Sequence, residues 1–280
     1  MHITYTYQEK ALGMAHAILL TESFIGNVDF IVFLGDNFIQ NGLTKLYETY
    51  IEKGYDGMLA LVPVKDPRRF GAAEVDNGRI VRLVEKPKEP KSNLAIAGVY
   101  FLKPFAFDII RKMKPSWRNE YEITEAYQMM IDSGYNIGYD IIRGWFKDTG
   151  TVDDFINCNR LVLDKISVDY SSASDNVRGR VIIGDDVEIS DDSTVMGPCF
   201  IGENTKIAGS YIGPYTSIGN GCSIKDTEIE DSVIMDNAII DTKKSKLRSS
   251  LIGSNSRILR SDSANGTLRL VLGRDSAVWI

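Results

Sequence analysis

Apolar residues in the first part of the chain alternate between helical spacing and strand spacing. Over residues 11–24 they recur every three to four positions, which predicts a helix, and residues 29–34 form a short apolar run that predicts a buried strand. This run ends in Gly35-Asp36-Asn37, which predicts a loop. Further helices are predicted over residues 43–53, 105–113, 122–132 and 153–163, and further strands over residues 57–64, 72–75, 79–84, 95–102 and 136–143.

One pair of strands forms a predicted hairpin. Asn77-Gly78 lies between the strands over residues 72–75 and 79–84, and an Asn-Gly pair readily adopts the positive φ angles of a tight turn. The other strands alternate with helices, so residues 1–165 are predicted to be an α/β domain with a doubly wound, mostly parallel sheet. Ligands of such sheets lie outside the carboxyl ends of the strands, where Asp36 and Asp148 fall.

A different period begins near residue 181. Apolar residues recur there at every sixth position, with small residues between them. The residues in this series are Ile183, Ile189, Val195, Ile201 and Ile207, and the pattern resumes at Ile212, Ile218 and Ile224. Such a hexapeptide repeat is typical of a left-handed parallel β-helix, which is predicted over residues 166–280. Because a solenoid exposes strand edges at its open ends, we expect a homo-oligomer that forms through the β-helix.

Composition narrows the classes of function. The 280 residues carry a formal net charge of −6, which gives no basic excess to attract nucleic acid or anionic lipid. Three scattered cysteines and two histidines, both near the start, indicate neither a disulfide framework nor a zinc site. No apolar run has the ~18 residues that a membrane span needs. These features predict a cytoplasmic protein without a nucleic-acid or membrane partner.

Two aspartates are candidate metal ligands. Asp36 and Asp148 each follow a predicted strand, and a hard cation such as Mg²⁺ is usually held by one or two carboxylates together with substrate phosphates. Either residue could instead cap a helix or close a turn. Two aspartates at strand ends of one sheet favour a shared magnesium ion.

Polar residues and glycines beside the hairpin are candidates for binding a sugar phosphate. Glu85 could accept hydrogen bonds from ring hydroxyls, and Lys86 could meet the phosphate as a point charge, although the two could equally form a solvated ion pair. Gly71 and the pair Gly98-Val99 offer backbone that a flat sugar could approach, or are ordinary strand residues. Whether these residues bind a sugar phosphate therefore depends on whether the fold brings them around one space.

Near the start of the chain, Gln8 precedes Gly13 and the beginning of a predicted helix. A glutamine amide can pair with the edge of a base, and a helix N-terminus can face an anion. His16, on the same helix, is interpreted as a packed residue rather than a catalyst.

Taken in order along the chain, these segments form a recognisable set. They are Gln8 with Gly13-Met14-Ala15-His16-Ala17, Leu34-Gly35-Asp36-Asn37, Arg69-Phe70-Gly71, Glu85-Lys86-Pro87, Ala97-Gly98-Val99-Tyr100 and Asp148-Thr149-Gly150-Thr151. In order and spacing they resemble the glucose-1-phosphate thymidylyltransferases, over nearly all of residues 3–165. The C-terminal repeats are similar to those of the long members of that family, which append a left-handed β-helix.

The resemblance implies a reaction and a role for each segment. In that family a sugar-1-phosphate oxygen attacks the α-phosphate of a nucleoside triphosphate, here dTTP or UTP, and releases pyrophosphate. By matching position, Asp36 and Asp148 would be catalytic residues that hold Mg²⁺, and Gln8 and Gly13 would contact the base. Four further residues would hold glucose-1-phosphate, and Lys86 among them would also be catalytic. These are Gly71, Glu85, Lys86 and Val99, with Gly98 beside them.

One expected feature of the family is missing from this chain. Members begin with a strand and a glycine-rich loop, Gly-x-Gly-Thr-Arg, which cradles the triphosphate, and no such loop occurs here. The resemblance therefore predicts an incomplete sheet in which the strand over residues 29–34 has an unpaired side, and a chain with impaired activity.

Two alternatives to an active transferase are open. The chain could be an inactive subunit that binds a sugar nucleotide or assembles with others through the β-helix. Acyl transfer by the β-helix, as in bifunctional relatives, is disfavoured because their histidine base has no counterpart in residues 170–280.

Overall fold

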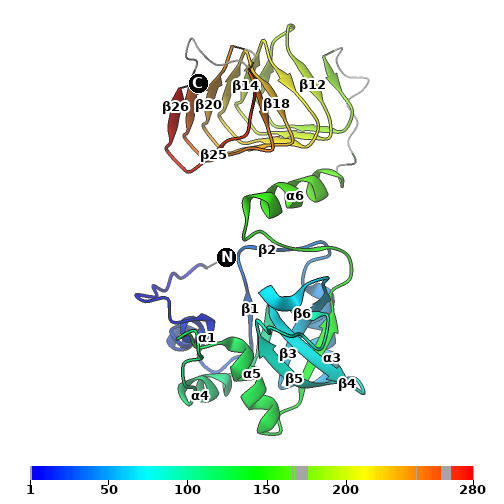
Figure 1. The fold of residues 1–280 in the computed structure, drawn as a ribbon, viewed down its shortest axis with the longest axis vertical. Coiled ribbons are helices and arrows are strands. Elements are labelled where there is room, and N and C mark those ends of the chain that lie inside the picture. Colours follow the sequence, from blue (N-terminus) through cyan, green and yellow to red (C-terminus); the bar gives the residue numbers. More distant parts are fainter. Residues whose placement is uncertain (1, 166, 168–175, 244, 260–265, 280) are drawn as a thin grey trace. The chain divides into compact units, whose positions relative to one another are not determined.

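Two units of structure divide the chain, Met1–Lys147 and Asp148–Ile280. The computed structural model describes residues 2–165, 167, 176–243, 245–259 and 266–279 (Figure 1). Among the residues it describes, no helix combines the length and the apolar character needed to cross a membrane.

The first unit contains a six-stranded sheet flanked by helices (Figure 1). Its helices are α1 (Met14–Leu19), α2 (Glu22–Ile25), α3 (Thr44–Lys53), α4 (Ala106–Arg111) and α5 (Ile123–Asp132), with a short 3-10 turn at Pro67–Arg69. Its strands are β1 (Phe30–Phe33), β2 (Asn37–Ile39), β3 (Gly57–Pro63), β4 (Gly71–Asp76), β5 (Arg79–Glu85), β6 (Leu94–Leu102), β7 (Ile137–Ile141) and β8 (Phe146–Asp148). β2 and β8 pair with each other in a separate two-stranded sheet.

The long strand β6 organises the six-stranded sheet. The order is β5-β4-β6-β3-β7, and β1 also pairs with β6. Since β1 and β3 both pair with Tyr100, Phe101 and Leu102, they lie on opposite edges of β6. β4 shares the β1 side of β6 further along, where Ala72 pairs with Ala95.

The pairing directions differ from the mostly parallel sheet that was predicted. Only β3 and β7 pair in parallel, whereas β6 runs antiparallel to β1, β3 and β4. β1, β3 and β7 do point the same way, but β6 lies between the first two and makes the sheet mixed. Among the described residues, β1 pairs only with β6.

Each face of the sheet carries its own apolar core, as a doubly wound fold requires. Alternate residues of a strand point to opposite faces, so Leu59 and Leu61 pack with α1, α4 and α5, whereas Met58 and Ala60 pack with α3. Tyr127 of α5 is fully buried and donates hydrogen bonds to the carbonyls of Phe101 and Met58. The α/β interpretation is confirmed.

The second unit is the predicted parallel β-helix, preceded by α6 (Val152–Leu163). Three six-stranded parallel sheets form its sides. The first contains β10 (Val181–Ile183), β13 (Cys199–Ile201), β16 (Thr216–Ile218), β19 (Val233–Ile234), β22 (Leu251–Ile252) and β25 (Val271–Leu272). The second contains β11 (Glu188–Ile189), β14 (Lys206–Ala208), β17 (Ser223–Lys225), β20 (Ile239–Asp241), β23 (Arg257–Leu259) and β26 (Ala277–Trp279). The third contains β9 (Val177–Arg178), β12 (Thr194–Met196), β15 (Tyr211–Ile212), β18 (Glu228–Glu230), β21 (Lys246–Arg248) and β24 (Thr267–Leu268).

The hexapeptide residues form the core of the β-helix. Equivalent positions of successive coils stack in register, as Ile201, Ile218 and Ile234 do along one sheet. These three side chains are at most 1% exposed. Each coil therefore buries one apolar side chain per side, which is why the repeat was visible in the sequence.

α6 belongs to the β-helix unit. Arg160 forms a bidentate ion pair with Asp231, and Asn159 donates to the carbonyl of Tyr215. Asp153 pairs with Arg269 near the last coil. The boundary predicted between residues 165 and 166 followed the change in sequence texture, which lies after α6, whereas the units separate at Lys147 and Asp148.

Candidate active site

Three predicted site residues, Asp36, Gly98 and Val99, lie at or near the edge of β6 that faces β1 and β4. β1 and β4 separate at Gly98, whose φ of +62° favours glycine, and the N–H of Leu34 donates to the carbonyl of Gly98 at 3.0 Å. Val99, the next residue, is completely buried and pairs with Phe33. The gap between the two strands leaves the carbonyls of Ala97 and Gly98 free to accept hydrogen bonds from the loop after β1.

Asp36 lies in that loop, and its neighbour anchors it. Asn37 is buried and donates from Nδ2 to the carbonyl of Ala97 at 3.0 Å. A Cβ at Gly98 would lie 2.1 Å from this same Nδ2, so only glycine lets the loop approach. The Asp36 side chain is exposed. The loop that carries Asp36 therefore lies close to Gly98 and Val99.

Gly71 and Glu85 face each other at the open end of the hairpin. Thr124, at the start of α5, donates from Oγ1 to Oε2 of Glu85 at 2.6 Å. A Cβ at Gly71 would meet Oγ1 of Thr124 and Cδ1 of Ile96 at 2.9 Å each. Glu85 is thus held by a hydroxyl donor in a space that depends on the absence of a side chain at Gly71.

Arg118 joins three carboxylates beside this pair. Its guanidinium lies 3.8 Å from Glu85, 3.1 Å from Glu122 and 2.9 Å from Glu120. Burial, and next the nearby charge of Glu85, raise the pKa of Glu122, and the same two causes raise the pKa of Glu125. The cluster concentrates negative charge around one cation, which is suited to accepting hydrogen bonds from hydroxyl groups.

The backbone conformation and one backbone hydrogen bond fix the position of Lys86. It has a positive φ of 42°, its N–H donates to the carbonyl of Phe70 at 3.0 Å, and its side chain is exposed. It takes part in no ion pair among the described residues. The solvated ion pair with Glu85 that the sequence left open is therefore not formed.

Gln8 and Gly13 are also brought together. Gln8 donates from Nε2 to the carbonyl of Gly13 at 3.2 Å and lies 2.9 Å from Nδ1 of His16. Gly13 packs against the backbone of Tyr121, where a Cβ would lie 2.7 Å from both its N and its O. Since Tyr121 precedes Glu122, the start of α1 adjoins the carboxylate cluster.

Asp148 ends β8 and starts the second unit. Its Oδ1 accepts the N–H of Gly150 at 2.9 Å, which forms a local turn, and Thr151 caps α6 by accepting the N–H of Asp154. The turn that was one interpretation of Asp148 is therefore present. The turn uses one of the two carboxylate oxygens of Asp148, and the role of this residue as a metal ligand stays a prediction.

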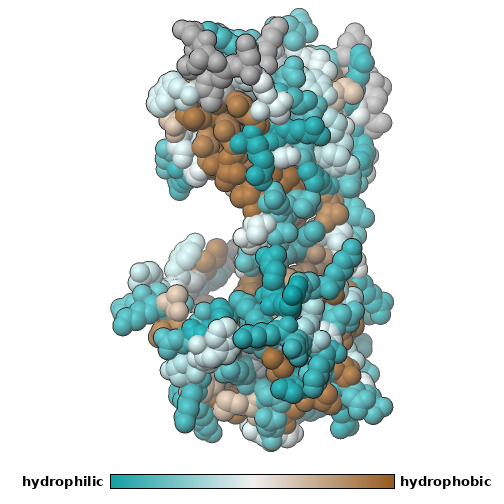
Figure 2. All heavy atoms as spheres, viewed as in Figure 1, coloured by the Kyte–Doolittle hydropathy of each residue, from teal (hydrophilic) through white to brown (hydrophobic). Residues whose placement is uncertain are grey.

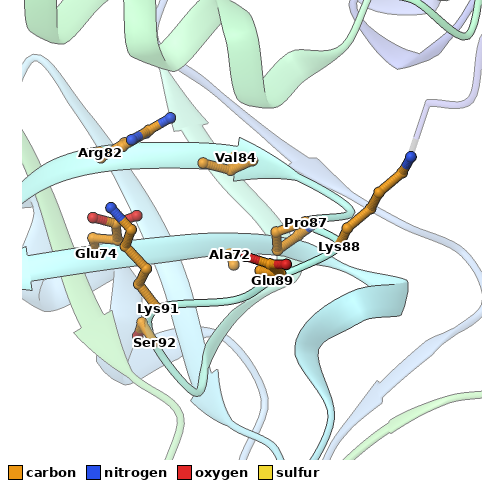
Figure 3. Close-up of a pocket in the computed structure, with 9 residues that line it drawn as sticks. All are labelled: Ala72, Glu74, Arg82, Val84, Pro87, Lys88, Glu89, Lys91 and Ser92. Carbon is orange, nitrogen blue, oxygen red and sulfur yellow. The ribbon is translucent and has the colours of Figure 1, made fainter.

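A hollow of about 190 Å³ lies on the opposite face of the hairpin (Figure 3). Its lining includes Ala72, Glu74, Arg82 and Val84, which alternate along β4 and β5 with the residues facing Thr124. None of the predicted site residues lines it. The hairpin thus has one face for the candidate site and a separate, charged outer face.

Comparison with known proteins identifies the family. The family described as Nucleotidyl transferase matches residues 1–165. The chain belongs to the nucleotidyl transferase family. A second family, described as GMPPB C-terminal domain, matches residues 195–278 within the β-helix. Members of the nucleotidyl transferase family generally use a divalent metal.

Relatives of this nucleotidyl transferase match its whole length. It is 41% identical to a glucose-1-phosphate thymidylyltransferase of Streptomyces antibioticus, over 100% of this chain and 80% of the relative. It is 38% identical to the low-salt glycan biosynthesis nucleotidyltransferase Agl11 of Haloferax volcanii, over 99% and 79%.

Solved structures match part of the chain. One, from Bacillus anthracis and named for glucose-1-phosphate thymidylyltransferase, was solved with sucrose and has a TM-score of 0.53 and 37% identity, covering 56% of this chain and 64% of that chain. A UDP-glucose pyrophosphorylase with UDP-glucose has a TM-score of 0.53 and 28% identity, covering 58% and 66%. Both support the nucleotidyl transferase fold.

Four residues of the site were not among the predicted ones. Asn37, Arg118, Glu122 and Thr124 contact or anchor predicted residues. The run from Arg118 to Glu122 carries three charged residues directly before α5, and it is the one signal in the sequence that could have indicated Arg118, Glu122 and Thr124. Which glutamate would face Glu85 depended on the fold.

Proposed function

We propose that the site of the first unit transfers a nucleotidyl group from dTTP or UTP to glucose-1-phosphate. A phosphate oxygen of the sugar phosphate forms a bond to the α-phosphorus, the bond from that phosphorus to the bridging oxygen breaks, and pyrophosphate leaves. The observation that carries the proposal is the Glu85, Thr124 and Gly71 arrangement, next to the Asp36 loop on one edge of β6.

Glu85 is the proposed acceptor for sugar hydroxyls. The hydrogen bond from Thr124 fixes Oε2, and Arg118 lies 3.8 Å from Oε1. A carboxylate that accepts one hydrogen bond and lies near one cation keeps lone pairs for ring hydroxyls, and hydrogen bonds to charged groups are worth about 1.5–3 kcal/mol each. The small space beside Gly71 favours a flat ring over a bulkier ligand.

The cations around this acceptor are proposed to hold the phosphate. Lys86 follows Glu85 directly and has an exposed ammonium group. Its positive charge would stabilise the charge that develops on the phosphoryl oxygens, which is the catalytic role expected for Lys86. Gln8 and Gly13, held at the start of α1, are proposed to contact the base.

Asp36 and Asp148 are proposed to hold a magnesium ion. Mg²⁺ needs only one or two carboxylates when substrate phosphates supply other ligands. Pairing of β2, which starts after Asp36, with β8, which ends at Asp148, supports the choice. When bound, the ion would neutralise charge on the phosphates.

Substitution of Glu85 tests the sugar site. Because Glu85→Gln removes the charge and keeps the shape, we expect affinity for glucose-1-phosphate to fall about 10-fold or more, as loss of a charged hydrogen bond implies. Isothermal titration calorimetry measures it. Glu74→Gln, on the outer face of the same hairpin, is the matched control and should bind as the parent does. Equal affinity of the parent and Glu85→Gln would contradict the assignment.

The second candidate function is an inactive subunit that binds a sugar nucleotide. The test compares this chain with a version extended at the N-terminus by a Gly-x-Gly-Thr-Arg loop, in a pyrophosphate-release assay with Mg²⁺, glucose-1-phosphate and dTTP or UTP. We expect the extended version to turn over at least about 10²–10³-fold faster, the loss typical of one missing oxyanion donor, and to stop when EDTA is added. Comparable turnover by both chains would show that this chain has its own phosphate site.

A homo-oligomer joined through the β-helix completes the proposal. The strands at each end of a solenoid have an edge without a neighbouring coil, and solenoids ordinarily cover such ends. A β-helix acetyltransferase gains no support, because both histidines of the chain lie outside the β-helix.

A further inference from the structure

The loop between α4 and α5 carries an aromatic ring that lies almost entirely in solvent. Trp117 is 82% exposed. Among the residues that the structure describes, it belongs to neither apolar core of the first unit and stacks on no other ring. Polar residues cover most of the face of this unit that Figure 2 shows. The indole therefore keeps a large apolar area in water, and a ligand that covers it would gain free energy.

A tight turn holds the backbone of Trp117. The N–H of Ser116 donates to the carbonyl of Glu120 at 2.8 Å. The hydroxyl of Ser116 accepts the N–H of Arg118 and donates to Oε1 of Glu122, both at 3.1 Å. Because these hydrogen bonds fix the turn, the point at which the exposed indole is attached is also fixed.

The same turn belongs to the candidate sugar site. Arg118 directly follows Trp117, and its guanidinium lies 3.8 Å from Glu85 and 3.1 Å from Glu122. Consecutive Cα atoms are about 3.8 Å apart, so the indole is attached next to a residue that reaches the proposed acceptor of sugar hydroxyls. An exposed side chain changes rotamer within nanoseconds. The ring can therefore turn onto a ligand at Glu85 while the backbone stays in place.

The side chains that contact Glu85 are polar and satisfy only part of a sugar. Thr124 donates a hydrogen bond to Glu85, and Arg118 supplies positive charge beside it. A pyranose ring also has faces made of C–H groups, and ligand sites usually combine a few polar groups with apolar or aromatic surface. Trp117 is the exposed aromatic side chain that this turn places beside the polar groups.

We propose that Trp117 is a specificity-determining residue that stacks on one face of the sugar ring bound at Glu85. The phosphate of an α-sugar-1-phosphate is axial and occupies one face of the ring, so the opposite face is left for the indole. In glucose that face carries only C–H groups, whereas in galactose one axial hydroxyl projects from it. Trp117 therefore favours glucose-1-phosphate over galactose-1-phosphate. This inference rests on the proposed function and names the group that selects the sugar.

Substitution of Trp117 tests the contact, and its exposure makes a loss of folding unlikely to accompany the change. Trp117→Ala should weaken glucose-1-phosphate binding by about 3- to 10-fold, the range expected for an aromatic contact, and leave galactose-1-phosphate binding unchanged. Trp117→Phe keeps a flat ring and should keep most of the preference. Trp279→Ala is the matched control, because it removes a 66% exposed tryptophan from the β-helix unit. Isothermal titration calorimetry with both sugar phosphates measures the affinities.

Tryptophan fluorescence reports the contact directly. Glucose-1-phosphate should shift the emission of the parent to shorter wavelength as the indole leaves water, and Trp117→Phe should bind without this shift. Unchanged glucose-1-phosphate affinity in Trp117→Ala, or an equal loss for both sugar phosphates, would overturn the inference. Affinity that falls in Glu85→Gln but not in Trp117→Ala contradicts this inference alone, whereas a parent that binds neither sugar phosphate contradicts the proposed function as well.

Discussion

The two units differ in how the contacts in their interiors are arranged. In the β-helix, residues such as Ile201, Ile218 and Ile234 occupy equivalent positions, and each packs against the residue one coil above and below. In the α/β unit almost every buried contact occurs once, as in the contact of Asn37 with Ala97 or of Thr124 with Glu85. Repetition distributes stability over many similar contacts, whereas single contacts can bring different chemical groups to one place. The candidate active site lies in the second kind of structure.

The largest effect should come from the core of the β-helix. Ile218 is 0% exposed, and Ile218→Ala should lower the free energy of unfolding by about 2–5 kcal/mol, the usual cost of a large-to-small core substitution. Urea denaturation followed by circular dichroism measures it. Ile201→Ala and Ile234→Ala should cost similar amounts if the coils are equivalent, and Ser223→Ala on the outer surface should cost little. Costs that differ severalfold between the three isoleucines would break the comparison.

A smaller but more local effect is expected at Gly98. A methyl group there would meet Nδ2 of Asn37 at 2.1 Å in a backbone with φ of +62°, so Gly98→Ala should cost about 1–3 kcal/mol and displace the Asp36 loop. Gly78→Ala is the matched control, because Gly78 also has a positive φ but no atom within 4 Å of a Cβ. Denaturation compares their stability, and NMR shifts of the Asn37 side-chain amide report the loop. Equal effects of the two substitutions would mean that the contact with Asn37 is unimportant.

The smallest expected effects concern pH, and the two units should respond in opposite directions. The raised pKa of Glu122 gives the α/β unit stability that is present at low pH and lost as the pH rises through that pKa. Burial alone would raise the pKa of Asp231, but hydrogen bonds from Arg160 and Ser249 leave it lowered, so its contribution is lost as the pH falls through that pKa.

Denaturation between pH 3 and pH 7 checks this difference. Glu122→Gln should make stability depend less on a rise in pH, and Asp231→Asn should make it depend less on a fall. The parent provides the reference at each pH. The same change in slope for both variants would contradict the assignment of opposite shifts.

The two units also differ in how much of their structure the sequence predicted. The hexapeptide period identified the β-helix and its inward residues, because a repeated pattern is evidence at every coil. Helices and strands of the α/β unit were placed within a few residues, but the predicted helix over residues 11–24 is two short helices, α1 and α2, separated at Leu20 and Thr21. The antiparallel insertion of β6 was missed, since apolar spacing does not record the direction of a strand.

Only part of the candidate site could be predicted from the sequence, and the reason is physical. Glycines such as Gly71 and Gly98 are required by close approaches that leave a trace in the sequence. Arg118 and Thr124 are ordinary surface residue types, and their importance comes from reaching Glu85 across the fold. Contacts between residues far apart in the chain therefore remained invisible until the sheet was known.

The polar contacts of α6 with the β-helix also relate the length of this helix to the number of coils. Asp164, Arg160 and Asp153 contact Tyr215, Asp231 and Arg269 in that order, so the helix runs against the direction in which the coils are added. Paired strands are about 4.8 Å apart and a turn of α-helix rises about 5.4 Å, so each coil corresponds to nearly one helical turn. A β-helix lengthened by a whole coil would therefore keep both terminal attachments only if α6 grew by three or four residues. The length of α6 is therefore matched to the number of coils that it spans.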